Sequence, residues 1–223
     1  MPLFDTPPAK TGFLHDVGSR ALSVAAVEND FVERVYEKLA KVYDFTFGPT
    51  LHPGRLEAIG RLGLRPGHSV LEVGVGTGIN LALYPRTCSV TGVDLSNRML
   101  AKARQRIRKH GLAHCHVLPM DAAAMAFPDN TFDVVYAPYV ISVVPDPVKV
   151  AQEMRRVCKP GGRFVFLNHF KSDHPLLSKL ETAISPLTVH IGFKADLDLG
   201  GFLAQAELEP QSIAKVNVPK MWS

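Results

Sequence analysis

The chain has 223 residues, a formal net charge of +4 and a sequence pI of about 9.0; 46% of its residues are hydrophobic and 21% are charged. This composition is typical of a globular protein and excludes a wholly disordered or collagen-like chain. No stretch approaches about 18 apolar residues without a charge, which argues against a transmembrane helix. The N-terminal residues MPLFDTPPAK contain neither a basic segment nor an apolar run, so we expect no secretory signal.

The three cysteines, Cys88, Cys115 and Cys158, are widely spaced and form no C-x-x-C pair. The sequence therefore contains no zinc or redox motif, and we expect three reduced thiols in a cytoplasmic protein. The basic excess suits an anionic surface or an anionic ligand, although solvated helix faces would explain it equally well.

Two N-terminal segments precede the main domain. Residues 1–18 contain several prolines and glycines without a clear period, which indicates a flexible arm. From residue 19 the apolar residues recur at steps of three and four, which predicts an amphipathic helix within a lid of residues 19–54. Its apolar stripe must lie on the core, on a partner or on a membrane surface. The stripe consists of Val24, Val27, Phe31, Val35, Leu39 and Val42.

Strands and helices alternate through the remaining chain, which we assign to one domain of residues 55–223. After a helix over residues 55–64, short apolar runs alternate with helical patterns, which predicts βαβ units and an α/β fold with a mostly parallel sheet. Strands are expected at residues 69–75, 89–95, 115–121, 132–138 and 163–170, and helices at residues 99–111 and 146–158. In such a sheet, ligands bind beyond the carboxyl ends of the strands.

A glycine-rich loop follows the first of these strands. Gly74, Gly76 and Gly78 allow positive φ angles and the close approach of a ligand to the backbone. The dinucleotide fingerprint requires a glycine where this chain has Ile79, which counts against NAD, and no G-K-S or G-K-T sequence of a P-loop follows.

Two carboxylates end the next two strands. Asp94, twenty residues after Gly74, can accept hydrogen bonds from both hydroxyls of a ribose; alternatively it caps the following helix, a role that Ser96 could fill equally well. Asp121 can accept from an exocyclic amino group of an adenine, or it is a solvated turn residue. An apolar slot for the purine ring would come from Leu95, Met99 and Ala122.

Four motifs in order resemble those of the class I S-adenosylmethionine-dependent methyltransferases. They are E-V-G-V-G-T-G from Glu72, V-T-G-V-D-L-S from Val90, D-A followed by P-D-x-x-F-D, and K-P-G-G from Lys159. The resemblance covers residues 64–170. It implies a Rossmann-like, mostly parallel sheet of seven strands with helices on both faces and an N-terminal helical lid. It also implies S-adenosylmethionine as donor, S-adenosylhomocysteine as product, no metal, and Glu72 near the methionine amino group.

Three further segments are similar to the bacterial, Rhodobacter-type phosphatidylethanolamine N-methyltransferases. These are Y-D-F-T-F-G from Tyr43, the run from Tyr139 to Pro147, and N-H-F from Asn168. The resemblance implies repeated methylation of a phospholipid amine toward phosphatidylcholine. It further implies a cytoplasmic monomer that contacts an anionic membrane surface peripherally.

The acceptor must lose a proton before attack, because a primary amine has a pKa of roughly 10.4. A dry pocket lowers that pKa, and His169 or a water beside it could accept the proton. Tyr139 could orient the amine or stack on the forming ammonium. We expect Tyr43 and Tyr36 to close over the methionine end, with Tyr36 on the substrate side beside Asn168. Lys171 is the candidate partner of the lipid phosphate.

Three other functions remain open at this point. A quinone-precursor C-methyltransferase shares the Y-D pair and the K-P-G-G turn, and a soluble small-molecule N- or O-methyltransferase would share the donor site. A non-catalytic lipid-surface protein could keep the pocket as scaffold. Ala137-Pro138 departs from the N-P-P-Y loop of nucleic-acid amino-methyltransferases, so we expect no nucleic-acid substrate.

Overall fold

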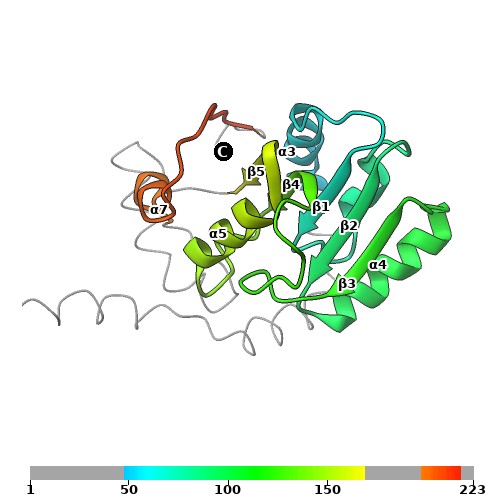
Figure 1. Ribbon diagram of the computed structural model, residues 1–223. Helices are drawn as coiled ribbons and strands as arrows, with labels where there is room; N and C mark the ends of the chain where they lie inside the picture. Colours follow the sequence, from blue (N-terminus) through cyan, green and yellow to red (C-terminus); the bar gives the residue numbers. More distant parts are fainter. Residues whose placement is uncertain (1–47, 169–196, 217–223) are drawn as a thin grey trace, which may run out of the picture.

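A parallel sheet with helices on both faces forms the centre of the molecule (Figure 1). The computed structural model describes residues 48–168 and 197–216. In these ranges five strands pair in the order β3-β2-β1-β4-β5, every pair parallel. The strands are β1 (Ser69–Val73), β2 (Ser89–Asp94), β3 (Cys115–Pro119), β4 (Phe132–Pro138) and β5 (Cys158–Leu167). The helices are α3 (Gly48–Arg61), the 3-10 helix η1 (Ile79–Leu83), α4 (Asn97–His110), α5 (Pro147–Val157) and α7 (Leu199–Gln205).

The two faces of the sheet carry separate apolar clusters because side chains alternate along each strand. Val70 of β1 faces the cluster that includes residues of α3 and α4. Its neighbour Leu71 faces the cluster that includes residues of α5 and α7. The sequence-based expectation of a Rossmann-like sheet covered on both faces is therefore confirmed. The expected seven strands are five in the described residues, and residues 19–47 of the expected lid lie outside them.

Helix α3 begins earlier than its sequence suggests. The prediction started a helix at Arg55 and treated Pro49 and Pro53 as breakers, whereas the helix runs from Gly48 to Arg61. Pro49 is tolerated because the first N–H groups of a helix have no partner within it. Pro53 follows one turn later and stays inside the helix. The boundary that we drew between residues 54 and 55 thus falls within one helix.

Two glycine segments take forms that the sequence analysis did not predict. The glycine loop leads into a single 3-10 segment, η1, whose C-cap Tyr84 is extended, as expected before Pro85. The K-P-G-G segment lies inside β5 and forms an irregularity against β4, with the register shifting between Phe132 and Val134. Between the pairs formed by these two residues β5 has more residues than β4, and such extra residues bend a strand locally without ending it.

One arginine fixes the loop that links β3 to β4. Arg156 of α5 donates from Nη1 to the carbonyl of Phe127 and from Nη2 to the carbonyl of Met125, each at 2.7 Å. Glu153, one helical turn away, holds the same guanidinium at 2.7 Å and accepts from the Met125 N–H. This support matters for the site because the loop begins beside Asp121.

All three cysteines are free and buried. Burial raises the pKa of each thiol, and that of Cys115 reaches about 12. The thiols therefore stay protonated near neutral pH and pack as small apolar groups.

Candidate functional site

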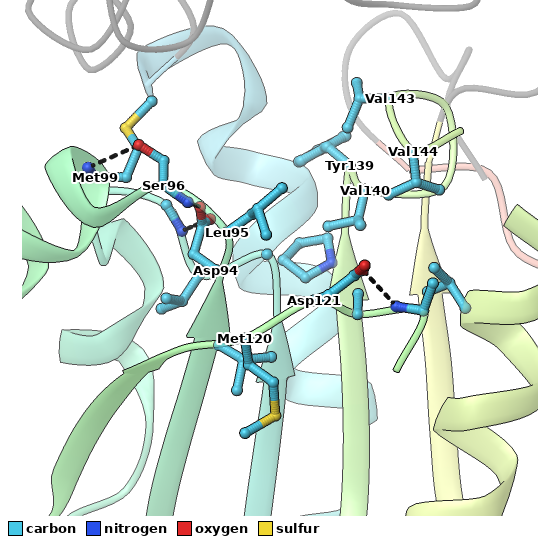
Figure 2. Close-up of a pocket in the computed structure, with 18 of the residues that line it drawn as sticks. Asp94, Leu95, Ser96, Met99, Met120, Asp121, Tyr139, Val140, Val143 and Val144 are labelled. Atoms are coloured by element: carbon cyan, nitrogen blue, oxygen red, sulfur yellow. Dashed lines mark hydrogen bonds between the residues drawn. The ribbon is translucent and has the colours of Figure 1, made fainter. Parts of the chain in front are cut away.

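A cavity of about 370 Å³ opens beyond the carboxyl ends of β1, β2, β3 and β4. This is where ligands bind in open α/β sheets, and the volume suits a small molecule. Eight residues singled out from the sequence line it: Gly74, Gly76, Asp94, Leu95, Met99, Asp121, Ala122 and Tyr139. The structure thus brings together residues from four separate strand ends (Figure 2).

The glycine loop forms the floor of this cavity. Gly74 has φ +67°, and a Cβ there would lie 2.3 Å from Cγ2 of Val140. A side chain at this position would therefore collide with the segment that follows β4. A Cβ at Gly78 would meet Leu81 of η1 and Ala103 of α4, and Gly78 does not line the cavity. Its contact with a cofactor stays a prediction.

Asp94 holds the glycine loop against the end of β2. Its Oδ2 accepts from the Gly76 N–H at 2.8 Å, and its Oδ1 accepts from the Ser96 N–H at 2.9 Å. Ser96, the alternative cap, is the N-cap of α4, with its hydroxyl accepting from the Met99 N–H. Backbone N–H groups therefore orient the carboxylate of Asp94, and the N-cap of α4 is Ser96.

Asp121 and the apolar slot lie on the neighbouring side of the cavity. The carboxylate accepts from the Ala123 N–H at 2.8 Å through Oδ1. Leu95 is 41% exposed, a high value for a leucine, and it lies with Met99 and Ala122 in the cavity lining. Figure 2 shows Leu95 and Asp121 on opposite sides of one space. A flat aromatic ring could therefore cover Leu95, and an amino group on that ring could donate a hydrogen bond to Asp121.

Tyr139, directly after β4, has a left-handed backbone with φ 60°. This conformation is unfavourable for a bulky residue and persists where the surroundings enforce it. Its N–H donates to the Leu167 carbonyl, and its hydroxyl donates to the Leu51 carbonyl at 3.3 Å. The guanidinium of Arg55 lies 4.8 Å from the ring centroid. These contacts hold the side chain of Tyr139, which lines the cavity, against α3.

Glu72, assigned by resemblance to the methionine amino group, lies beneath the floor of the cavity. It is 1% exposed, and its carboxylate accepts from Asn80 Nδ2 at 2.8 Å and from the Tyr84 hydroxyl at 2.5 Å. Burial raises the pKa of Glu72 from 4.5 to about 7, although both hydrogen bonds oppose the shift. Glu72 does not line the cavity, so direct contact with a ligand stays a prediction.

Other assigned residues lie elsewhere. Asn168 is fully buried, and its Oδ1 accepts from the N–H and the hydroxyl of Ser142, which fastens the segment after β4. It does not line the cavity, and its contact with substrate stays a prediction. Four candidates lie outside the described residues: Tyr36, Tyr43, His169 and Lys171.

The sequence analysis missed Arg55 and Lys149, which both line the cavity. Lys149 is exposed on the first turn of α5. Arg55 is 6% exposed and comes from α3, a helix whose start was misplaced. An arginine on the core-facing side of a helix before the first strand was the available signal, because a buried arginine needs a partner.

The described residues contain no cluster of side chains suited to a metal ion. Among the same residues, no helix combines the length and the apolar character needed to span a bilayer.

Comparisons with known proteins identify the family. Residues 71–166 match the model of a methyltransferase domain. A phosphatidylethanolamine N-methyltransferase from Cereibacter sphaeroides is 41% identical over 184 residues, which are 82% of this chain and 90% of that enzyme. The chain belongs to the class I S-adenosylmethionine-dependent methyltransferases. It is a methyltransferase of the type that this relative represents.

Three further proteins are similar to this chain. A ubiquinone/menaquinone biosynthesis C-methyltransferase UbiE from Pseudoalteromonas translucida is 33% identical over 68% of this chain and 65% of its own length. The structure of Haemonchus contortus phosphoethanolamine N-methyltransferase 2, in complex with phosphomonomethylethanolamine and S-adenosylhomocysteine, is 25% identical. It superposes with a TM-score of 0.66 over 80% of this chain and 43% of that one. An Aquifex aeolicus methyltransferase shares the fold, with a TM-score of 0.63 at 21% identity, over 82% of this chain and 93% of that one.

The residues of this methyltransferase fit the methyl donor of the family. The cavity is large enough for a small ligand, and carboxylates from β2 and β3 stand at one end beside an apolar slot. An arginine and a tyrosine stand at the other end, beside β1 and β4. Both ends of a molecule with a nucleoside and an amino acid part therefore find polar groups.

Proposed function

We propose that this methyltransferase transfers methyl groups from S-adenosylmethionine to the amine of phosphatidylethanolamine and to its mono- and dimethyl forms. The observation that carries the proposal is the 41% identity to a phosphatidylethanolamine N-methyltransferase over 90% of that enzyme. The apolar lining after β4, where Val140, Val143 and Val144 face the cavity, is compatible with a lipid headgroup carried on apolar chains (Figure 2).

The donor would lie across the strand ends with its adenine over β3 and its ribose over β2. Leu95, Met99 and Ala122 would enclose the adenine, whose exocyclic amino group would donate to Asp121. Asp94 would accept from the ribose hydroxyls while keeping its bonds to the glycine loop. Gly74 and Gly76 would pass under the ribose and the methionine part, where a side chain would obstruct the approach.

The reaction needs a neutral amine in line with the methyl group. The nitrogen lone pair forms the new N–C bond while the C–S bond breaks, and sulfur keeps the electron pair. Positioning supplies much of the rate, and a dry apolar slot lowers the pKa of the amine toward neutrality. The proton lost from the nitrogen would pass to His169 or to a water beside it.

Tyr139 would orient the amine in this scheme. Arg55 already covers one face of the ring. A forming ammonium would therefore meet the hydroxyl or the other face, where a cation–π contact would favour it. Tyr36, Asn168 and Lys171 remain proposed substrate residues, with Lys171 for the phosphate.

The enzyme would work as a cytoplasmic monomer at the membrane surface. A diacyl lipid leaves a bilayer at a cost of about 0.8 kcal/mol per CH₂, so it is more favourable for the enzyme to approach the lipid. The net charge of +4 would favour an anionic surface.

The likeness to UbiE supports one rival, a quinone-precursor C-methyltransferase. Methyl transfer to carbon would require a base that removes a proton from an activated ring and would not need an ammonium site. A soluble amine such as phosphoethanolamine is a second rival, because the Haemonchus contortus enzyme of similar fold was solved with phosphomonomethylethanolamine.

The deciding experiment supplies the full chain with S-adenosylmethionine labelled in the methyl group and separates the products by thin-layer chromatography. Parallel reactions contain phosphatidylethanolamine liposomes, phosphatidylcholine liposomes, a demethylated quinol, or phosphoethanolamine. We expect label in the methylated phospholipids of the first reaction alone. Label confined to the quinol or to phosphoethanolamine would overturn the proposal.

Asp94→Ala tests the donor site separately from the methyl acceptor. It removes the carboxylate that we place on the ribose, so donor binding measured by calorimetry should fall at least about 10-fold, the loss expected for a charge-assisted hydrogen bond. Glu57→Ala removes an exposed carboxylate away from the cavity lining and should keep wild-type binding. Retained donor binding in Asp94→Ala would place the ribose elsewhere.

A further inference from the structure

Arg55 is a buried cation whose hydrogen bonding is incomplete. The residue is 6% exposed and lines the cavity. Its Nη1 donates to Asn80 Oδ1 at 3.2 Å, whereas its Nε has no partner among the described residues. Burying a guanidinium without full hydrogen bonding is costly, so the side chain is suited to an anionic ligand that enters the cavity.

No carboxylate of the described residues forms an ion pair with Arg55. The nearest acid in the network is Glu72, which is reached through Asn80: Asn80 accepts from Arg55 and donates to Glu72. Tyr84 occupies the other oxygen of that carboxylate. Glu72 therefore stabilises the arrangement at a distance, and no other carboxylate of the described residues acts as a direct counterion of the guanidinium fork.

The position of Arg55 follows from the strand order. Asp121 follows β3 by two residues, Asp94 ends β2, and Tyr139 follows β4, with β1 and the glycine loop between β2 and β4. Neighbouring strands lie about 4.8 Å apart, so the path from β2 to β4 covers roughly 10 Å. A donor with its ribose on Asp94 would extend its amino acid part along this path and reach the Arg55–Tyr139 pair.

We propose that Arg55 binds the α-carboxylate of the methyl donor through its guanidinium fork and thereby positions the sulfonium for transfer. A planar fork matches a carboxylate with two parallel hydrogen bonds. The ring of Tyr139, 4.8 Å from the guanidinium carbon, and the amide of Asn80 fix the orientation of that fork. This inference rests on the donor site described under Proposed function and is independent of the identity of the methyl acceptor.

The test compares two ligands that differ in the carboxylate alone. Calorimetry measures the binding of S-adenosylmethionine and of decarboxylated S-adenosylmethionine, which keeps the ammonium, to the wild type and to Arg55→Met, which keeps an apolar stem. We expect the dissociation constant of S-adenosylmethionine to rise about 10- to 100-fold in the variant. That of the decarboxylated ligand should change less than about twofold. Arg55→Lys should lie between the two, because an ammonium keeps the charge and loses the fork.

Arg61→Met is the control, since Arg61 lies on the same helix with its side chain 57% exposed. Both ligands should bind it as they bind the wild type. An equal loss of both ligands in Arg55→Met would show a merely structural role and overturn the inference. Equal affinity of the two ligands for the wild type would also overturn it, with the donor site itself intact. Failure of the wild type to bind either ligand would instead contradict the donor site.

Discussion

Hydrogen bonds between buried polar groups hold the cavity wall formed by β1 and β2, whereas the wall that follows β4, although Asn168 fastens it from behind, presents mainly apolar side chains to the cavity. On the first wall, Asp94 accepts from two backbone N–H groups and Glu72 accepts from Asn80 and Tyr84. On the second wall, Val140 is buried and Val143 and Val144 line the cavity. Directional bonds specify one ligand closely, whereas an apolar wall accepts many shapes. Under the proposed function, the first wall would hold one donor and the second wall could admit different acceptors.

The junction of the two walls offers the largest expected effect. In Gly74→Ala the new Cβ would lie 2.3 Å from Val140, at a φ of +67°. Left-handed strain of roughly 1–2 kcal/mol and overpacking of roughly 1–3 kcal/mol predict a loss of about 2–5 kcal/mol in the free energy of unfolding. Donor binding should fall with it. Urea denaturation and calorimetry measure the two effects.

Gly111→Ala is the matched control, because its φ is +58° and a Cβ there meets nothing within 4 Å. It should lose roughly 1–2 kcal/mol from strain alone and keep donor binding. Equal losses of unfolding free energy in Gly74→Ala and Gly111→Ala would show that the contact of residue 74 with Val140 contributes nothing to the effect.

The free energy of unfolding should also depend on pH through Glu72, which lies behind the first wall. The folded pKa of Glu72 is about 7 and its ordinary value is 4.5, so the folded state holds the proton more tightly than the unfolded state does. Stability contributed by this group is therefore full below pH 4.5, falls as the pH rises toward 7, and stays low above it. The fall amounts to roughly 3 kcal/mol. Glu72→Gln removes it.

The measurement is the difference in unfolding free energy between Glu72→Gln and wild type from pH 4.5 to pH 8. This difference should shift in favour of the glutamine by roughly 3 kcal/mol over that range. The same comparison with Glu57→Gln removes an exposed carboxylate on α3 as the control. A difference that stays constant with pH would contradict a buried carboxyl that titrates near neutrality.

The smallest effect is expected on the apolar side. Tyr139→Phe removes the hydroxyl that donates to the Leu51 carbonyl and keeps the ring beside Arg55. We expect a stability loss of about 1 kcal/mol and unchanged donor binding. If the hydroxyl orients the amine, kcat should fall by roughly 10-fold. An unchanged kcat would leave the ring as the functional part of this residue.

The fold was largely predictable because each element carries its own period and end signals. The strand expected at residues 132–138 is β4, and the helix expected from Asp146 is α5, capped by that aspartate. Two predictions based on glycine and proline were wrong. Pro53 was expected to break a helix but lies inside α3, and the K-P-G-G segment was expected to form a turn but lies within β5. For the K-P-G-G segment, pairing of β5 with β4 decides the outcome.

The site was predictable where a residue lies at a strand end, as Asp94 and Asp121 do. It was less predictable where position depends on packing between distant elements. Arg55 reaches the cavity because α3 packs over the sheet, which no local spacing shows. Glu72 lies in β1 opposite Gly92, two residues short of the level of Asp94, and its side chain accepts from Asn80 beneath the floor.

The burial of Cys88, Cys115 and Cys158 makes the natural chain a ready background for labelling. Maleimide dyes react with exposed thiolates, and none of these three thiols supplies one near neutral pH. A cysteine placed at the exposed Lys149 would therefore be modified selectively. A fluorophore attached there would stand at the cavity and report the arrival of a ligand in real time.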